Sequence, residues 1–155
     1  MIAVVRPDDW NWLLLFHLLA AFTLVGGVIT VVLVSLAAGR KAWPDQVPLL
    51  RAIAFRTNLV VVLPAFIAVH VFGDILAGRQ YEHGDPDWLS ASFAITDIAL
   101  IVGGVLLTLL QFWVLRRTRA GRTGGWPAGL ATYLPAVILA ALTAVIVLMT
   151  GKPVY

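Results

Sequence analysis

Residues 11–34 read NWLLLFHLLAAFTLVGGVITVVLV, a stretch that is almost entirely hydrocarbon and yet contains one histidine, His17. At about 1.5 Å rise per residue, roughly 20 apolar residues in a helix cross the ~30 Å hydrocarbon layer of a membrane. The stretch belongs to a longer apolar run, residues 12–38, and therefore predicts a membrane-spanning helix. This run is longer than the ~7–15 residues of a signal-peptide core, so we expect it to stay in the protein.

Three further apolar runs of comparable length follow it, at residues 53–77, 91–115 and 129–150. Charged residues make up only 12% of the 155, which is too few to cover the surface of a soluble domain of this size. We therefore predict an all-α fold, a transmembrane four-helix bundle that forms a single integral membrane domain over residues 1–155. Little of the chain remains for any other domain.

Positive charge gathers around the first and third connections between these runs. The first connection holds prolines expected in a loop, Pro44 and Pro48, and arginines that include Arg51 and Arg56, while the third reads RRTRAGR. Cytoplasmic loops of membrane proteins carry an excess of Lys and Arg. The sequence therefore predicts that both connections are cytoplasmic and that the N and C termini lie on the non-cytoplasmic side. We expect the cytoplasmic (plasma) membrane of a prokaryote.

The net charge of +3 is explained by this topology and by attraction to anionic lipid, so nucleic-acid binding is not expected. The expected partners are the lipid bilayer and either other membrane subunits or a second copy in a homo-oligomer. The chain has no cysteine, which excludes disulfides, thiolate metal sites and cysteine nucleophiles.

Four ionisable side chains fall in the predicted non-cytoplasmic half of the bundle. Counting about 1.5 Å per residue from the helix ends places His17 about 8 Å deep, His70 about 12 Å deep and Asp97 about 13 Å deep. Asp74 lies one turn from His70 on the same face. Ionisable groups at membrane depth are costly and tend to line functional interiors, so their common depth on three helices predicts one site.

Neutral imidazole binds iron, copper and zinc, and a nearby carboxylate can orient it through the other ring nitrogen. We therefore expect His17 and His70 to be cofactor or metal ligands, Asp74 to orient His70, and Asp97 to handle protons. The expected cofactor is haem b, otherwise a transition-metal ion or none.

A second interpretation stays open for each of these residues. Either histidine can simply hydrogen-bond to a neighbouring helix, and Asp74 can be solvated near the membrane surface. His83 is more easily explained as a solvated loop residue than as a ligand. A haem held between His17 and His70 also needs the first two helices to be splayed or diagonal, because packed helices lie only about 8–10 Å apart.

The segment FHLLAAFTLVGGVITVVLV, residues 16–34, places a histidine after an aromatic residue and before a Gly-Gly pair. It resembles the first helix of the HemJ-type protoporphyrinogen oxidases, of the CopD-type copper-resistance proteins, and of four-helix membrane families of unknown function. The HemJ resemblance implies that His17 is a haem ligand. That family also uses a membrane-embedded lysine, and no predicted span here contains one. The Met-rich copper path of the CopD type is missing too, so the resemblance leaves the function unassigned.

The leading functional hypothesis is a small polytopic membrane protein that binds haem b or a metal ion and has a redox or electron-transfer role. Whether it is an enzyme stays open. One alternative is a non-catalytic accessory subunit of a larger membrane complex. Another is a small transporter or proton path, which would use a polar stripe predicted on the third helix: Ser90, Asp97, Gly104, Thr108 and Gln111.

Overall fold

The structure is a computed structural model that describes residues 8–40, 44–80, 87–122 and 124–150, and its elements there are all helical. Besides α-helices it contains a short 3₁₀ turn and two π-helical segments. In chain order they are α1 (Asp8–Gly39), η1 (Pro44–Gln46), α2 (Val47–Thr57), η2 (Asn58–Val62), α3 (Leu63–Gln80), α4 (Asp87–Ala99), η3 (Leu100–Leu106), α5 (Leu107–Arg119) and α6 (Trp126–Thr150).

Within the described residues, four helical stretches are long and apolar enough to cross a membrane, as predicted: Asn11–Gly39, Pro44–Arg79, Leu89–Arg119 and Trp126–Val147. The second stretch begins well before the predicted residue 53. Pro48 lies in the first turn of α2, where a helix needs no backbone donor, so the proline starts the helix instead of ending a loop. The loop assignment of Pro48 was therefore wrong, and Arg51 and Arg56 lie on a helix.

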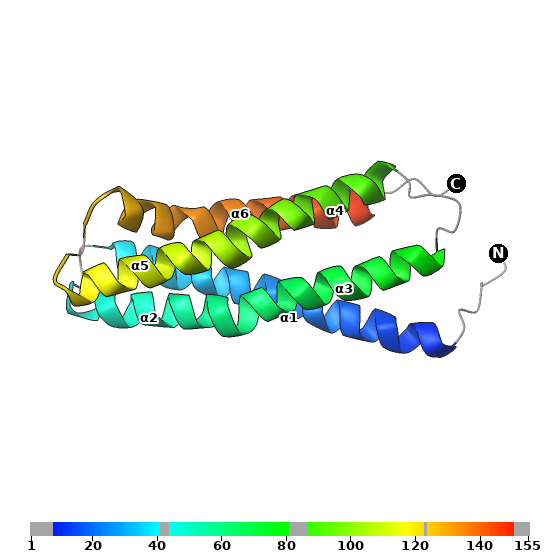
Figure 1. Ribbon diagram of the computed structural model, residues 1–155, viewed down its shortest axis with the longest axis horizontal. Coiled ribbons are helices and arrows are strands. Elements are labelled where there is room, and N and C mark those ends of the chain that lie inside the picture. The colour runs from blue at the N-terminus through cyan, green and yellow to red at the C-terminus, as the bar shows by residue number, and fades with distance from the viewer. Residues whose placement is uncertain (1–7, 41–43, 81–86, 123, 151–155) are drawn as a thin grey trace.

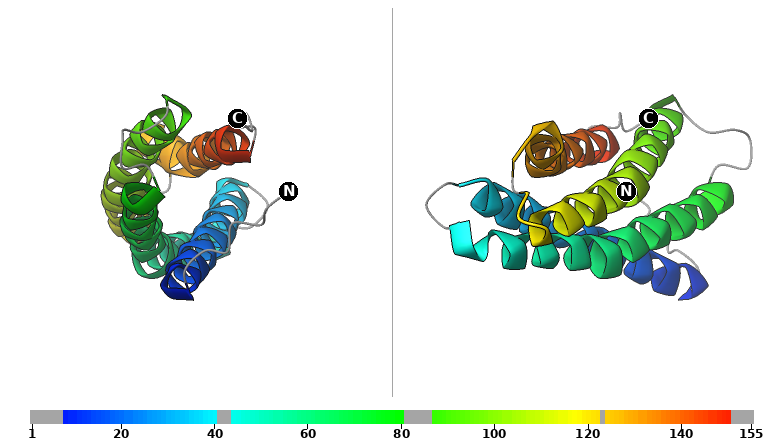
Figure 2. Two further views of the ribbon diagram at one scale, coloured as in Figure 1. Left: turned by 90° about the vertical axis from the view of Figure 1, so that its right-hand side faces the viewer. Right: turned by 60° about the vertical axis from the view of Figure 1, so that its left-hand side comes forward.

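The four spans run alternately up and down the bundle (Figure 1). Each packs against the next in the chain, and α1 also packs against α6, so the spans close into a ring of neighbours. We call the end where α1 is followed by α2, and α5 by α6, the basic end, because Arg40, Arg116 and Arg119 lie there. We call the opposite end, where α1 begins and α6 ends, the terminal end. The helices diverge toward the terminal end (Figure 2).

The buried apolar core occupies the middle of the bundle. It includes Val28 and Val31 of α1, Phe66 of α3, Leu107 of α5 and Ile138 of α6. The glycine pair Gly103–Gly104 allows close helix packing beside this core, because a Cβ built at Gly103 would lie 2.9 Å from Ile138 Cδ1. The core thus separates polar side chains near the terminal end from others near the basic end.

Two π-helical segments face each other beside this core. In η2 the Leu63 N–H bonds to the Asn58 carbonyl, and in η3 the Leu107 N–H bonds to the Val102 carbonyl. These bonds run to the fifth residue back, which widens the helix by one residue per turn. Asn58 Nδ2 joins the segments by donating to the Gly103 carbonyl at 3.2 Å and to Thr108 Oγ1 at 2.7 Å.

The π segment η3 also divides the predicted polar stripe of the third span. Gly104, Thr108 and Gln111 are buried in the bundle, whereas Ser90 and Asp97, which precede or flank the start of η3, are exposed. The extra residue in the wide turns rotates the two halves of the span against each other, so a stripe counted at a constant ~100° per residue does not continue through it. The expectation of one continuous polar face was therefore wrong.

Candidate functional site

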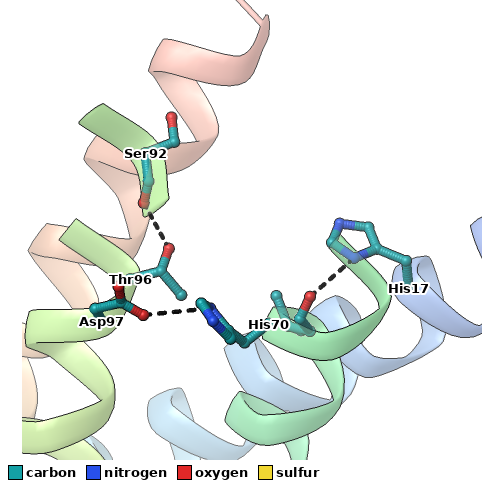
Figure 3. A network of polar contacts seen from close by, with 6 residues as sticks. His17, His70, Ser92, Thr96 and Asp97 are labelled. Atoms are coloured by element: carbon teal, nitrogen blue, oxygen red, sulfur yellow. Dashed lines mark hydrogen bonds and ion pairs between the residues drawn. The ribbon is translucent and has the colours of Figure 1, made fainter. Parts of the chain in front are cut away.

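His17 is held by a main-chain carbonyl of the neighbouring span. Its Nδ1 lies 3.2 Å from the carbonyl oxygen of Val69 on α3 (Figure 3). Because a carbonyl oxygen can only accept, Nδ1 carries the proton and Nε2 keeps its lone pair. No second hydrogen bond of the His17 side chain is found among the described residues, so Nε2 is available for another partner.

A glycine makes this close approach possible. A Cβ added at Gly73 of α3 would lie 3.2 Å from His17 Cε1, tighter than an ordinary van der Waals contact. One residue earlier on each helix, Phe16 and Phe72 stack with ring centroids 5.6 Å apart. The spans are therefore in direct contact at His17, and no porphyrin can lie between α1 and α3 at this point.

His70 points away from α1, toward α4 (Figure 3). Its Nδ1 lies 3.3 Å from Asp97 Oδ1, within ion-pair distance, but the two atoms are not aligned as a hydrogen bond and Nδ1 has no other partner among the described residues. The ring of Phe93 meets the His70 ring edge-on at 5.8 Å. The side chains of His70 and Asp97 are 33% and 54% exposed, so the pair lies at the edge of the bundle rather than in its core.

We call His17, His70 and Asp97 the imidazole site. The contacts through Val69 and Asp97 bring all three to one level along the bundle, in agreement with the depths counted from the sequence. The two rings nevertheless lie on different sides of α3. His17 covers positions 69 and 73, which are about 80° around the helix from position 70 at ~100° per residue. The rings therefore do not converge on a common point between α1 and α3.

Asp74 does not take the orienting role expected for it. It is exposed and forms no hydrogen bond or ion pair with other described residues, whereas Asp97 lies beside His70. His83 lies outside the described residues. In the described part of the chain no group of three or more His, Cys, Asp or Glu side chains is placed to hold a metal ion. Among the described residues, a metal or haem at the imidazole site would therefore find a single imidazole as its ligand and not a cluster of ligands.

The structure also shows a polar group that sequence analysis missed, near the basic end. Arg51 is 4% exposed, and its Nη2 donates to Thr132 Oγ1 at 2.8 Å and to the Ala128 carbonyl at 3.2 Å. The sequence did contain a signal for the burial of Arg51, because Arg51 follows Pro48 by one turn. A helix whose first turn contains this proline includes Arg51 in the span.

Comparison with protein-family models, with curated proteins and with solved structures gives no match for this chain.

Proposed function

We propose that this chain is a small membrane protein of a prokaryotic plasma membrane that binds haem b or a transition-metal ion at the imidazole site and takes part in electron transfer. The observation that carries the proposal is the hydrogen bond from His17 Nδ1 to the Val69 carbonyl. Histidines that ligate metals commonly donate their other ring N–H to a carbonyl or carboxylate, which fixes the tautomer and the ring orientation. His17 has this arrangement, with Nε2 as the free ligand atom.

The surroundings favour one axial imidazole, or one imidazole on a bare ion, over a haem clamped between two histidines. The contact of His17 with Gly73 leaves no space for a porphyrin between α1 and α3. The aromatic rings of Phe16, Phe72 and Phe93 give the site the apolar walls that a haem requires. When bound, such a group would supply one-electron redox chemistry.

The His70–Asp97 pair has a separate role in this proposal. An imidazole nitrogen and a carboxylate oxygen can both accept a proton, and His70 Nδ1 lies 3.3 Å from Asp97 Oδ1. The two side chains are therefore close enough to pass a proton between them. His70 is also the second candidate ligand, through whichever ring nitrogen is unprotonated.

The test is the optical spectrum and metal content of the full chain purified in lipid nanodiscs. The proposal expects a Soret band or a bound transition metal, lost in His17→Leu and retained in Asp74→Asn, because Asp74 is exposed and forms no hydrogen bond or ion pair with the described residues of the site. A colourless, metal-free wild-type protein would contradict the proposal, and so would a cofactor that survives His17→Leu combined with His70→Leu. If that colourless protein co-purified with a larger membrane complex, the accessory-subunit alternative would be favoured.

A second candidate function, a proton path, is favoured by the same His70–Asp97 contact. A path would have to pass the apolar core around Phe66 and Leu107, which lies between this pair and the polar residues near the basic end. Proton flux into vesicles measured for the wild type and for Asp97→Asn tests it. Equal flux in the two would exclude the pair from any proton path.

A further inference from the structure

An arginine lies buried inside the bundle near the basic end. The Arg51 side chain is 4% exposed, and its Nη1 is buried and has no hydrogen-bond partner among the described side chains. Its Nη2 donates to two neutral acceptors of α6, Thr132 Oγ1 and the Ala128 carbonyl. No carboxylate whose side chain the structure describes forms an ion pair with Arg51.

Two further buried polar side chains lack partners at a neighbouring level. Ser35 of α1 is fully buried and Gln111 of α5 is 2% exposed, and neither the Ser35 hydroxyl nor the Gln111 amide is hydrogen-bonded to a described residue. Ser35 lies one turn from Gly39, whose Cβ would touch Thr132 Cγ2 at 3.1 Å. Thr132 is in turn the residue that holds Arg51.

The register of α2 and α5 brings Gln111 to the same region. Asn58 is bonded to Thr108, and Arg51 lies two turns from Asn58 toward the basic end. Gln111 lies about one turn from Thr108 in the same direction. At about 1.5 Å per residue, the main-chain positions of Gln111 and Arg51 are then about one helical turn apart along the bundle. A long arginine side chain can span that separation.

Buried polar atoms in native proteins nearly always have a hydrogen-bond partner, which can be protein, ordered water or a bound ion, and a buried charge is stable only when it is compensated. Guanidinium, amide and hydroxyl groups are all hydrogen-bond donors, and their net charge here is positive. We propose that Ser35, Arg51, Gln111 and Thr132 form a binding site, the arginine site, for a small inorganic anion of the halide class. This site is separate from the imidazole site and does not depend on its function.

The size of the anion follows from the packing. The unpartnered atoms of Ser35, Arg51 and Gln111 each expose less than 1 Å² of surface. They come from helices that are in direct contact with one another: α1 with α2, α2 with α5, and α1 and α5 with α6. Because so little space surrounds these atoms, a monatomic ion requires a smaller movement of the side chains than phosphate or sulfate, which need room for four oxygens.

Thermal unfolding of the full chain in nanodiscs tests the proposal, with sodium chloride, sodium gluconate and sodium sulfate compared at equal ionic strength. We expect chloride to raise the unfolding temperature by about 3–5 °C at about ten times its Kd, and gluconate and sulfate to have no such effect. Equal temperatures in chloride and gluconate would mean that the site holds ordered water only, which overturns the proposal. Equal stabilisation by sulfate would also overturn it.

Variants assign the effect to the site. Gln111→Leu and Ser35→Ala should lose most of the chloride-dependent shift, whatever their own stability, because each removes a donor from the anion. Arg56→Gln is the matched control, since it removes an exposed positive charge from the same helix and should keep the shift. A chloride effect that is unchanged in Gln111→Leu, or lost in Arg56→Gln, would show that chloride acts elsewhere. Arg51→Leu is informative only if it folds, and the other variants do not depend on it.

Discussion

At the His17 side chain, one backbone carbonyl and one glycine decide which ring nitrogen is free. The Val69 carbonyl accepts a hydrogen bond from the protonated Nδ1, and Gly73 leaves room for the ring against α3. The common level of His17 and His70 along the bundle was predictable from the sequence, because helix rise converts residue number into distance. The partner of His17 was not predictable, because a main-chain carbonyl has no signature in the pattern of side chains.

For the two aspartates, too, the position along the helix was predictable from the sequence and the partner across helices was not. Asp74 shares a helical face with His70 and was therefore the natural choice for an orienting carboxylate. The structure places Asp97 of another helix there instead, 3.3 Å from His70. Which side chains meet across helices depends on the rotation of each helix about its axis, and periodicity fixes that rotation only up to the first irregular turn.

Substitution at Gly73 tests the contact with His17. Gly73→Ala should be about 1–2 kcal/mol less stable than Gly78→Ala, because its methyl would lie 3.2 Å from His17 Cε1, whereas a methyl at position 78 meets no atom within 4 Å. The free energy of unfolding in mixed micelles titrated with SDS measures the difference. Equal stability of the two variants would mean that His17 does not pack on Gly73.

At the scale of elements, the π segments η2 and η3 set how the second and third spans fit together. Asn58 and Gly103 lie in these segments and are joined by a hydrogen bond. The spans themselves were predictable from length and hydropathy. The wide turns were not predictable. Pro64 follows η2 by two residues but no proline follows η3 in the same way, and the Gly103–Gly104 pair of η3 has a counterpart, Gly26–Gly27, in the regular helix α1.

Replacing Asn58 by Leu should lower the free energy of unfolding by about 1–3 kcal/mol, because two cross-helix hydrogen bonds are lost and the Gly103 carbonyl stays buried. The same SDS titration measures this. Thr30→Val is the control, since the Thr30 hydroxyl is exposed and bonds only within its own helix, and its effect should stay within about 0.5 kcal/mol. Comparable losses in both variants would contradict the role given to Asn58.

The Gly-Gly pairs offer a second comparison at this scale. Gly103→Ala should cost about 1–3 kcal/mol, because the new Cβ would lie 2.9 Å from Ile138 Cδ1 and 3.1 Å from its Cγ2. Gly26→Ala meets nothing within 4 Å and should be neutral or stabilising. The unfolding midpoints of the two variants and of the wild type in the SDS titration measure this difference in stability. A Gly103→Ala protein as stable as Gly26→Ala would show that α6 is not packed there.

For the whole molecule, the basic end sets the orientation expected in the membrane. Arg117 lies over the ring of Trp113 at 4.8 Å and Arg116 over Phe112 at 5.8 Å, so these cations extend from exposed aromatic residues at the end of α5. Such an arrangement suits a membrane surface. Charge distribution made this end recognisable in the sequence, but Arg51 was assigned to the loop because its burial depends on where α2 starts.

Orientation can be measured with single cysteines, because the chain has none of its own. Arg122→Cys should react with a membrane-impermeant maleimide only after cells are permeabilised, and Asn11→Cys should react in intact cells, since the positive-inside rule puts the basic end in the cytoplasm. Both positions are exposed. The opposite labelling pattern would reverse the proposed topology and place the imidazole site in the cytoplasmic half.

The proposal for the whole molecule depends on a free Nε2 at His17, and nitrogen NMR of isotope-labelled histidine in nanodiscs observes that atom directly. The chain has three histidines, so His17→Gln assigns the signal. In metal-free protein we predict the Nδ1–H tautomer for His17, with an Nε2 resonance that moves when zinc ion or zinc protoporphyrin is added as a diamagnetic probe. An unprotonated Nδ1, or an Nε2 signal that neither probe shifts, would contradict the account.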